Sequence, residues 1–228
     1  MGKKNRAHNI LWDPIKIGLI ILIPIILSSL VGVKAIFGEE NPLAGKIIAL
    51  DAGHGADDIG AWNKDYQIAE KDVNLVVAYT LKDKLEANGA TVILTRTDDS
   101  EDPSNRERCK RAKGADILIS IHHNGSSDST VDGTETYYTQ PSDKPLAQAE
   151  YNELIKVFGP GRGVKKAAYG MTVLCKMPST LTEAYFLTNN IRAQQYLAYN
   201  NPDDSNDHIV DWETNALFQG LVNYFNTH

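Results

Sequence analysis

Cysteine is scarce in this chain, which has only Cys109 and Cys175 among its 228 residues. The two are not spaced as a Cys-x-x-Cys pair, so the sequence predicts no cysteine-based zinc site. Outside the cell they could form a disulfide. We expect Cys109 on a helix and Cys175 on a strand, and their separation does not follow from the sequence. Their pairing is therefore left open.

An excess of positive charge is also missing, because the formal net charge is −6 at pH 7. The remainder is more acidic still once the basic N-terminus is set aside. A nucleic-acid-binding protein would show a basic face, so nucleic acid is excluded as the expected partner. We find no internal repeat and no low-complexity tract, and one globular domain is the simplest organisation for this length.

Only one long uncharged hydrophobic run occurs, at residues 17–33, and Lys3, Lys4 and Arg6 precede it. Such a pattern is typical of an export signal or of a membrane anchor. A buried core helix is a weaker alternative, because the run lacks an amphipathic stripe. Both main interpretations place the rest of the chain outside the cytoplasm. We predict a leader at residues 1–36, either secreted or membrane-anchored through residues 17–33, a linker at 37–45 and a catalytic domain at 46–228.

Strands and helices alternate along that domain. We expect helices at residues 70–88, 104–113, 145–158, 190–198 and 211–225, the second capped by Ser104. Strands are expected at residues 46–51, 91–95, 116–121, 133–139, 172–176 and 180–186. The alternation predicts a three-layer α/β/α fold with a mostly parallel, mixed sheet of about six strands flanked by helices.

Two of the apolar strands end in histidine, and this juxtaposition is the main functional signal. His54 follows the strand at 46–51 between two glycines, and His122 ends the strand at 116–121. The carboxyl ends of parallel strands meet at one edge of a sheet, where ligands gather. The loop after His54 leads back to Glu70 at the start of the next helix. Either histidine alone would be more typical of an ordinary hydrogen-bonded residue.

Glu183 lies within an otherwise apolar strand, where a carboxylate is costly to bury unless it is paired or near a cation. Two imidazoles and a carboxylate around an open position are typical of catalytic zinc. A further carboxylate beside the metal can transfer a proton to a leaving nitrogen. The combination suits amide hydrolysis, with His54, Glu70 and His122 as metal ligands and Glu183 as the catalytic group.

His123 and Asn124 follow His122 directly. Adjacent residues of an extended strand point to opposite faces, so we expect only one of the two histidines to face the metal. His122 is the better ligand. His123 and Asn124 are predicted to lie behind the ligands or to contact substrate.

The sequence resembles the zinc-dependent N-acetylmuramoyl-L-alanine amidases from about Lys46 to Phe225. The motifs that carry the resemblance are Leu-Asp-Ala-Gly-His-Gly at 50–55, Glu-Lys-Asp-Val-Asn-Leu at 70–75, Thr-Arg-Thr-Asp at 95–98, Ser-Ile-His-His-Asn at 120–124, Gly-Val-Lys at 163–165 and the segments 178–183 and 186–189. Each motif is weak alone, but their order and spacing are specific. The resemblance implies one zinc ion held by His54, Glu70 and His122, catalysis by Glu183, a six-stranded sheet, and cleavage between N-acetylmuramic acid and L-alanine in peptidoglycan.

The chain departs from the family pattern at Ala56, where glycine is usual, at His123, where a small or apolar residue is usual, and at Ala184-Tyr185. None of these changes removes a ligand. Residues 125–145 leave little room for an inserted autoinhibitory helix, so a regulatory partner protein is an alternative means of control. Two other functions stay open: a catalytically silent peptidoglycan-binding or regulatory module, and a zinc peptidase of similar architecture.

Overall fold

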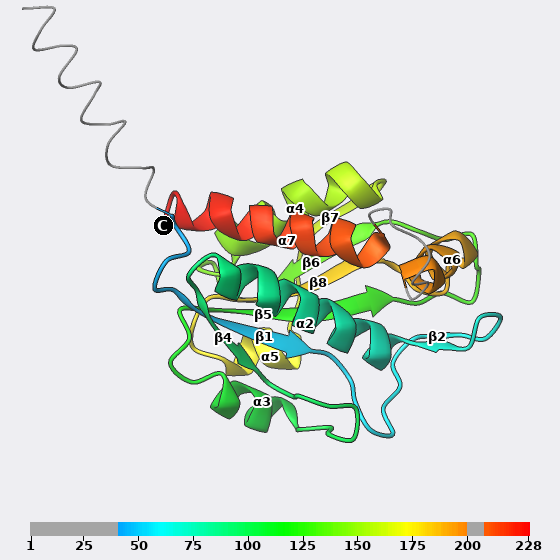
Figure 1. Cartoon of the computed structure of the whole chain (residues 1–228), viewed down its shortest axis with the longest axis horizontal. Helices are drawn as coiled ribbons and strands as arrows, with labels where there is room; N and C mark the ends of the chain where they lie inside the picture. Colours follow the sequence, from blue (N-terminus) through cyan, green and yellow to red (C-terminus); the bar gives the residue numbers. More distant parts are fainter. Residues whose placement is uncertain (1–40, 200–207) are drawn as a thin grey trace, which may run out of the picture. The chain divides into compact units, whose positions relative to one another are not determined.

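The predicted three-layer arrangement is present in the computed structural model, which describes residues 41–199 and 208–228 (Figure 1). The central sheet has six strands in the order β4-β1-β5-β8-β6-β7. Their bounds are β1 Ile47–Ala52, β4 Thr91–Leu94, β5 Ile117–Asn124, β6 Thr134–Tyr138, β7 Gly161–Lys166 and β8 Ser179–Phe186. All neighbours are parallel except β6 and β8, which makes the sheet mixed.

The helices cover the sheet unevenly. Helices α2 (Glu70–Ala87), α4 (Lys144–Phe158) and α7 (Ile209–Phe225) pack on one face, over the larger hydrophobic core, and α6 (Asn190–Tyr199) adjoins α7. The short helices α3 (Asn105–Arg111) and α5 (Gly170–Leu174) pack on the other face, over a smaller core that includes Ala49 and Leu118 (Figure 1). Ser104 caps α3 by accepting a hydrogen bond from the Glu107 amide, as predicted.

Three parts of the sequence-based assignment were wrong. Residues 172–176 were expected to form a strand, but residues 170–174 form α5, whose Met171 and Thr172 side chains are buried. Strand β7 was not expected, because Gly161–Lys166 has no alternation of apolar residues. It lies at an edge of the sheet, where the solvent-facing side needs no apolar side chains. A small hairpin, β2 (Trp62–Asn63) and β3 (Ile68–Ala69), was also missed.

Cys109 and Cys175 form a disulfide, with their Cα atoms 5.2 Å apart. Cys175 follows α5 rather than lying on a strand, so the bond joins the two short helices on the thinly covered face. The pairing that the sequence left open is thus present.

The predicted leader at residues 1–36 and the first part of the predicted linker lie outside the described residues. Within residues 41–199 and 208–228, none of the helices has the length and apolar character of a membrane span.

Candidate functional site

Three side chains with metal-binding atoms converge at the carboxyl ends of β1 and β5. The donor atoms of His54, Glu70 and His122 lie within 4.8 Å of one another. Glu70 stands between the two imidazoles, with Oε2 3.1 Å from Nε2 of His54 and Oε1 3.0 Å from Nδ1 of His122. These are the three residues that the sequence placed together, and the fold brings them to one edge of the sheet.

Glycines make room for these groups. A Cβ atom on Gly53 would lie 2.2 Å from the His122 ring, and one on Gly60 would lie 2.5 Å from Oε2 of Glu70. Gly60 also has φ +64°, a conformation that favours glycine. His54 itself has φ +62°, an uncommon value for a residue other than glycine that often occurs at functional sites. Ala56, where the family usually has glycine, has φ +44° and is similarly constrained.

Two buried guanidinium groups hold the backbone at His54 and just before it. Arg96 is fully buried and donates to the carbonyl oxygens of Ala52 and Gly53 at 2.9 and 3.2 Å. Arg108 on α3 donates to the carbonyl oxygens of Ala52 and His54, each at 2.7 Å. The side chain of His54 is in turn held by Asp58, whose Oδ2 lies 2.9 Å from Nδ1. Sequence reasoning assigned no role to Asp58, although Asp58 lies only four residues after His54, across the same turn.

Negative charge dominates this cluster. Burial would raise the pKa of Glu70, but hydrogen bonds from His122 and His54 outweigh it and hold the pKa well below its usual value. Burial would lower the pKa of His54, but Glu70 and Asp58 outweigh it and raise the pKa to about 9. An ionised, buried carboxylate between two imidazoles is a favourable environment for a divalent cation. The donor set and the space that the glycines leave therefore fit zinc.

Glu183 lies beside this cluster on the neighbouring strand. The register pairs His122 of β5 with Glu183 of β8, so both side chains are on the face of the sheet that α3 and α5 cover. Oε2 of Glu183 is buried and has no hydrogen-bond partner in the described part of the chain. Burial, followed by the charges of Glu70 and Glu135, raises the pKa of Glu183 well above its usual value.

His123 points to the opposite face, into the core beneath α2 and α7, and is only 1 % exposed. Its Nδ1 lies 2.7 Å from Oδ1 of Asn74, and its Nε2 lies 2.9 Å from Oε2 of Glu213. Its backbone amide donates to Oε1 of Glu70 at 3.0 Å. His123 therefore lies behind the cluster of His54, Glu70 and His122, and its buried side chain does not line the pocket.

Asn74 and Glu213 were not predicted as part of the site. Asn74 donates from Nδ2 to the Gly53 carbonyl at 3.1 Å and to Oε1 of Glu70 at 3.3 Å. The signal that could have identified both residues is a polar side chain on the buried face of an amphipathic helix. Asn124 is partly buried and reaches Oε2 of Glu135 at 3.4 Å, and a substrate contact for it stays a prediction.

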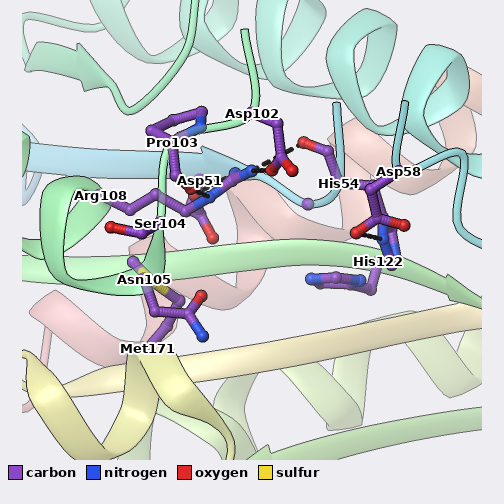
Figure 2. Close-up of a pocket in the computed structure, with 11 residues that line it drawn as sticks. Asp51, His54, Asp58, Asp102, Pro103, Ser104, Asn105, Arg108, His122 and Met171 are labelled. Atoms are coloured by element: carbon purple, nitrogen blue, oxygen red, sulfur yellow. Dashed lines mark hydrogen bonds and ion pairs between the residues drawn. The ribbon is translucent and has the colours of Figure 1, made fainter. Parts of the chain in front are cut away.

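A pocket of about 410 Å³ adjoins His54 and His122 on the side of α3 and α5 (Figure 2). Figure 2 shows the Arg108 side chain between Asp51 and Asp102, while His54 and His122 lie together with Asp58 at the other end of the pocket. His54 and His122 are thus accessible to a ligand from this face. The lining residues are Asp51, Gly53, His54, Asp58, Asp102, Pro103, Ser104, Asn105, Arg108, His122 and Met171.

Comparison with known proteins identifies this arrangement. The family model described as N-acetylmuramoyl-L-alanine amidase matches residues 48–211, which is more than half of the chain. The chain belongs to this amidase family. The matched range contains His54, Glu70, His122 and Glu183.

Individual amidases are similar over the same region. N-acetylmuramoyl-L-alanine amidase LytC of Bacillus subtilis is 39% identical over 157 residues, which are 66% of this chain and 31% of that protein. The probable cell wall amidase LytH of Staphylococcus aureus is 37% identical over 155 residues, 66% of this chain and 51% of that protein. This chain therefore spans about a third and about half of these two relatives.

Solved amidase structures share the fold. An N-acetylmuramoyl-L-alanine amidase from Clostridium difficile 630 has a TM-score of 0.71 and 29% identity, covering 80% of this chain and 98% of that one. The CwlD amidase of Clostridioides difficile, solved in complex with the GerS lipoprotein, has a TM-score of 0.65 and 28% identity, covering 81% and 100%.

Proposed function

We propose that this protein is a zinc-dependent amidase that hydrolyses the bond between the lactyl group of N-acetylmuramic acid and the L-alanine of a peptidoglycan stem peptide. The observation that carries the proposal is the convergence of His54, Glu70 and His122 next to the unpartnered Glu183 carboxyl. Membership of the amidase family supports the reaction class.

His54, Glu70 and His122 would hold the zinc ion. When bound, zinc supplies Lewis acidity, which polarises the scissile carbonyl group and lowers the pKa of water. Asp58 and Asn74 orient the ligands, because Asp58 accepts from the His54 ring and Asn74 donates to Glu70. These contacts fix the orientation of the proposed ligand side chains.

Glu183 is the group that moves the proton. Oε2 of Glu183 has no hydrogen-bond partner among the described residues and is therefore free to take a proton, and burial raises the pKa of Glu183, which favours the protonated form that can deliver the proton. We assign Oε2 of Glu183 to accept the proton of the attacking water and to deliver it to the leaving nitrogen of L-alanine.

Two other functions give different products. A zinc peptidase of the same architecture would cut between amino acids and leave the lactyl amide intact. A silent wall-binding or regulatory module would release nothing, and it would not require the buried, protonatable Glu183 beside the ligand cluster.

The test uses the full chain on purified peptidoglycan, with and without a chelator, and analyses the products by mass spectrometry. We expect about one zinc per chain, stem peptides with a free L-alanine N-terminus, and complete loss of release after chelation. Glu183→Gln should reduce kcat at least 100-fold, the lower end of what a general acid–base group contributes. The zinc content of this variant should be unchanged. A chain that holds zinc but produces only cuts between amino acids, or none, would overturn the amidase assignment.

We further propose that the protein acts outside the cytoplasm, with residues 1–36 as an export signal or membrane anchor. The cell wall amidases among its relatives support this location. A regulatory partner is an additional proposal, supported by the CwlD complex with a lipoprotein. Fractionation of cells expressing the full chain, with N-terminal sequencing of the product, distinguishes a cleaved leader from a retained anchor.

A further inference from the structure

Two cations on the edge strand β7 reach the same carboxylate. Nε of Arg162 lies 2.5 Å from Oε1 of Glu135, and Nζ of Lys165 lies 2.7 Å from the same oxygen. Side chains three residues apart on a regular strand point to opposite faces. Both can reach Glu135 only because β7 is irregular at this point.

The irregularity is a one-residue bulge. Thr134 of β6 is paired with Gly161, whereas the next residue, Glu135, is paired with Gly163, so Arg162 is the extra residue. Gly163 has φ +111°, which favours glycine. The bulge turns Arg162 toward the face that carries Lys165. It thereby explains a sequence motif, Gly-Val-Lys at 163–165, to which the proposed chemistry gives no role.

The cations lie in line with the proposed catalytic group. Glu135 of β6 is paired with Glu183 of β8, which is paired with His122 of β5. Directly paired residues share a face, so the three side chains form a row across three adjacent strands. With neighbouring strands about 4.8 Å apart, the cations on the next strand are roughly 5–10 Å from Glu183.

The single carboxylate of Glu135 does not neutralise both cations. The carboxylate is 3% exposed, while the Arg162 and Lys165 side chains are 42% and 41% exposed. The hydroxyl of Tyr137 donates to the other oxygen of Glu135. The two terminal nitrogens of Arg162 have no hydrogen-bond partner in the described part of the chain, although the guanidinium lies over the Phe186 ring, 5.0 Å from its centroid, and one positive charge is left in surplus. Exposed ion pairs add little stability, whereas an arginine fork matches a carboxylate well.

Beyond the opposite end of the row lies a pocket that is rich in carboxylates. The pocket beside His54 is lined by three carboxylates, those of Asp51, Asp58 and Asp102, against the single guanidinium of Arg108. A negatively charged substrate group is favoured beside β7, where one positive charge is left over. The lactyl sugar of the scissile bond is neutral, because its only carboxyl is in the amide, while the stem peptide carries the carboxylates.

We propose that Arg162 and Lys165 form a subsite for the first free carboxylate of the stem peptide, the α-carboxylate of the γ-linked D-glutamate that follows L-alanine. This inference rests on the proposed amidase function and orients its substrate, with the sugar toward the acidic pocket and the peptide toward β7. A peptide residue spans at most about 3.6 Å, so this carboxylate lies within about 7 Å of the scissile nitrogen. That reach matches the separation between Glu183 and the cations.

The first experiment compares two soluble substrates, N-acetylmuramoyl-L-alanyl-γ-D-glutamyl-L-lysine amide and the same compound with the α-carboxylate converted to a carboxamide. The full chain should prefer the free carboxylate about 10-fold to 100-fold in kcat/KM, the range expected for hydrogen bonds to a charged group. Arg162→Gln and Lys165→Gln should each remove most of this preference through KM. The matched control is Lys166→Gln, an equal charge change at an exposed neighbour, which should retain it.

Thermal unfolding of each variant establishes that the fold is kept. A wild type without preference overturns the subsite. Equal losses on both substrates in Arg162→Gln and Lys165→Gln also overturn it, because the cations would then only support Glu135.

A binding measurement separates this proposal from the amidase assignment. Titration calorimetry with the product dipeptide L-alanyl-γ-D-glutamate, against its α-amide, needs no turnover. Tighter binding of the free carboxylate, lost in Arg162→Gln and Lys165→Gln, supports the subsite even if neither substrate is hydrolysed, in which case the amidase assignment alone fails. Hydrolysis of both substrates at equal rates with equal dipeptide binding overturns the subsite and leaves the amidase assignment intact.

Discussion

His123 and Glu213 form a pair in which both side chains are completely buried, between β5 and α7. Nε2 of His123 and Oε2 of Glu213 are 2.9 Å apart, and Oε1 of Glu213 has no hydrogen-bond partner among the described residues. Removing one partner of a buried polar pair strongly reduces the free energy of unfolding, whereas replacing both partners together need not reduce it. His123 also connects Glu213 to Asn74, which contacts the proposed ligand Glu70.

We therefore predict strong coupling between the two residues. His123→Leu leaves the Glu213 carboxyl buried without its partner and should reduce the free energy of unfolding by about 3–5 kcal/mol. The double variant His123→Leu, Glu213→Leu should be more stable than His123→Leu alone, because it removes the unpaired group. Urea unfolding of the wild type, both single variants and the double variant measures the coupling. Additive effects of the two substitutions would show that the pair does not interact.

The proposed ligand residues could be predicted from the sequence because the position of each is fixed by its place on an element. His54 and His122 end strands, and Glu70 begins a helix that returns to the same edge. The residues that orient them were not, because their contacts depend on how layers pack. Glu213 is 90 positions away from His123, and no sequence pattern brings the two together.

At the scale of elements, sequence patterns predicted the buried strands and the long helices and failed at the edges. Strands β1 and β5 have apolar runs because both of their faces are covered. Strand β7 has no such run, and its pairing with β6 depends on a bulge at Arg162. Helix α5 contains Thr172 and Val173, which favour strands. The segment is nevertheless helical and packs against the smaller core. Local propensity is a weak guide for so short a segment.

The Cys109–Cys175 disulfide is the covalent link between α3 and α5, the two short helices on the thinly covered face. It closes a long loop, with a sequence separation of 66 residues. Such a bond restricts the unfolded chain, and its loss typically costs about 2–4 kcal/mol. Cys109→Ser, Cys175→Ser should lower the unfolding free energy by this amount in urea titrations.

The matched control for this prediction is reduction of the wild type. Dithiothreitol should destabilise the wild type to the level of the double variant and leave the double variant unchanged. Equal stability of the oxidised and reduced wild type would contradict the prediction. The requirement for an oxidised pair agrees with the proposed location outside the cytoplasm.

At the scale of the whole molecule, the two faces of the sheet carry different features. One face is closed by α2, α4 and α7, and this side holds the main core and the His123 network. The other face is only partly covered by α3 and α5, and this side carries His122, Glu183 and the pocket. A row of paired residues on the open face joins the proposed metal cluster to the cations of β7. The proposed catalytic groups thus stand on strands whose other face is covered by α2, α4 and α7.

The closed face also contains a carboxyl group that should make the stability of the whole domain depend on pH. Glu150 of α4 is fully buried near α7, with one hydrogen bond, from the hydroxyl of Thr180 on β8 at 3.1 Å. Burial outweighs that hydrogen bond and raises the pKa of Glu150 to about 8. In the unfolded chain the same group has its ordinary pKa, near 4.3.

The sign of the effect follows from proton binding. Between these two pKa values the folded protein keeps the proton on Glu150 while the unfolded chain loses it, so the free energy of unfolding decreases as the pH rises. The stabilising contribution is complete below about pH 4.3 and is lost by about pH 8, with a total on the order of 5 kcal/mol. Glu150→Gln mimics the protonated carboxyl and removes the titration. The variant should therefore gain stability relative to the wild type as the pH increases through this window.

Urea unfolding at pH 5, 7 and 9 measures the difference between Glu150→Gln and the wild type. We expect the stability of the variant relative to the wild type to increase at each step. Only the wild type must either bury an ionised carboxylate or take up a proton when it folds. Asp83→Asn is the matched control, since the Asp83 side chain is 80% exposed and its substitution should give nearly the same difference at every pH. A constant difference for Glu150→Gln would mean that Glu150 ionises alike in the folded and unfolded states. The junction of α4, α7 and β8 would then have to admit water, which the complete burial of Glu150 and its packing against α7 argue against.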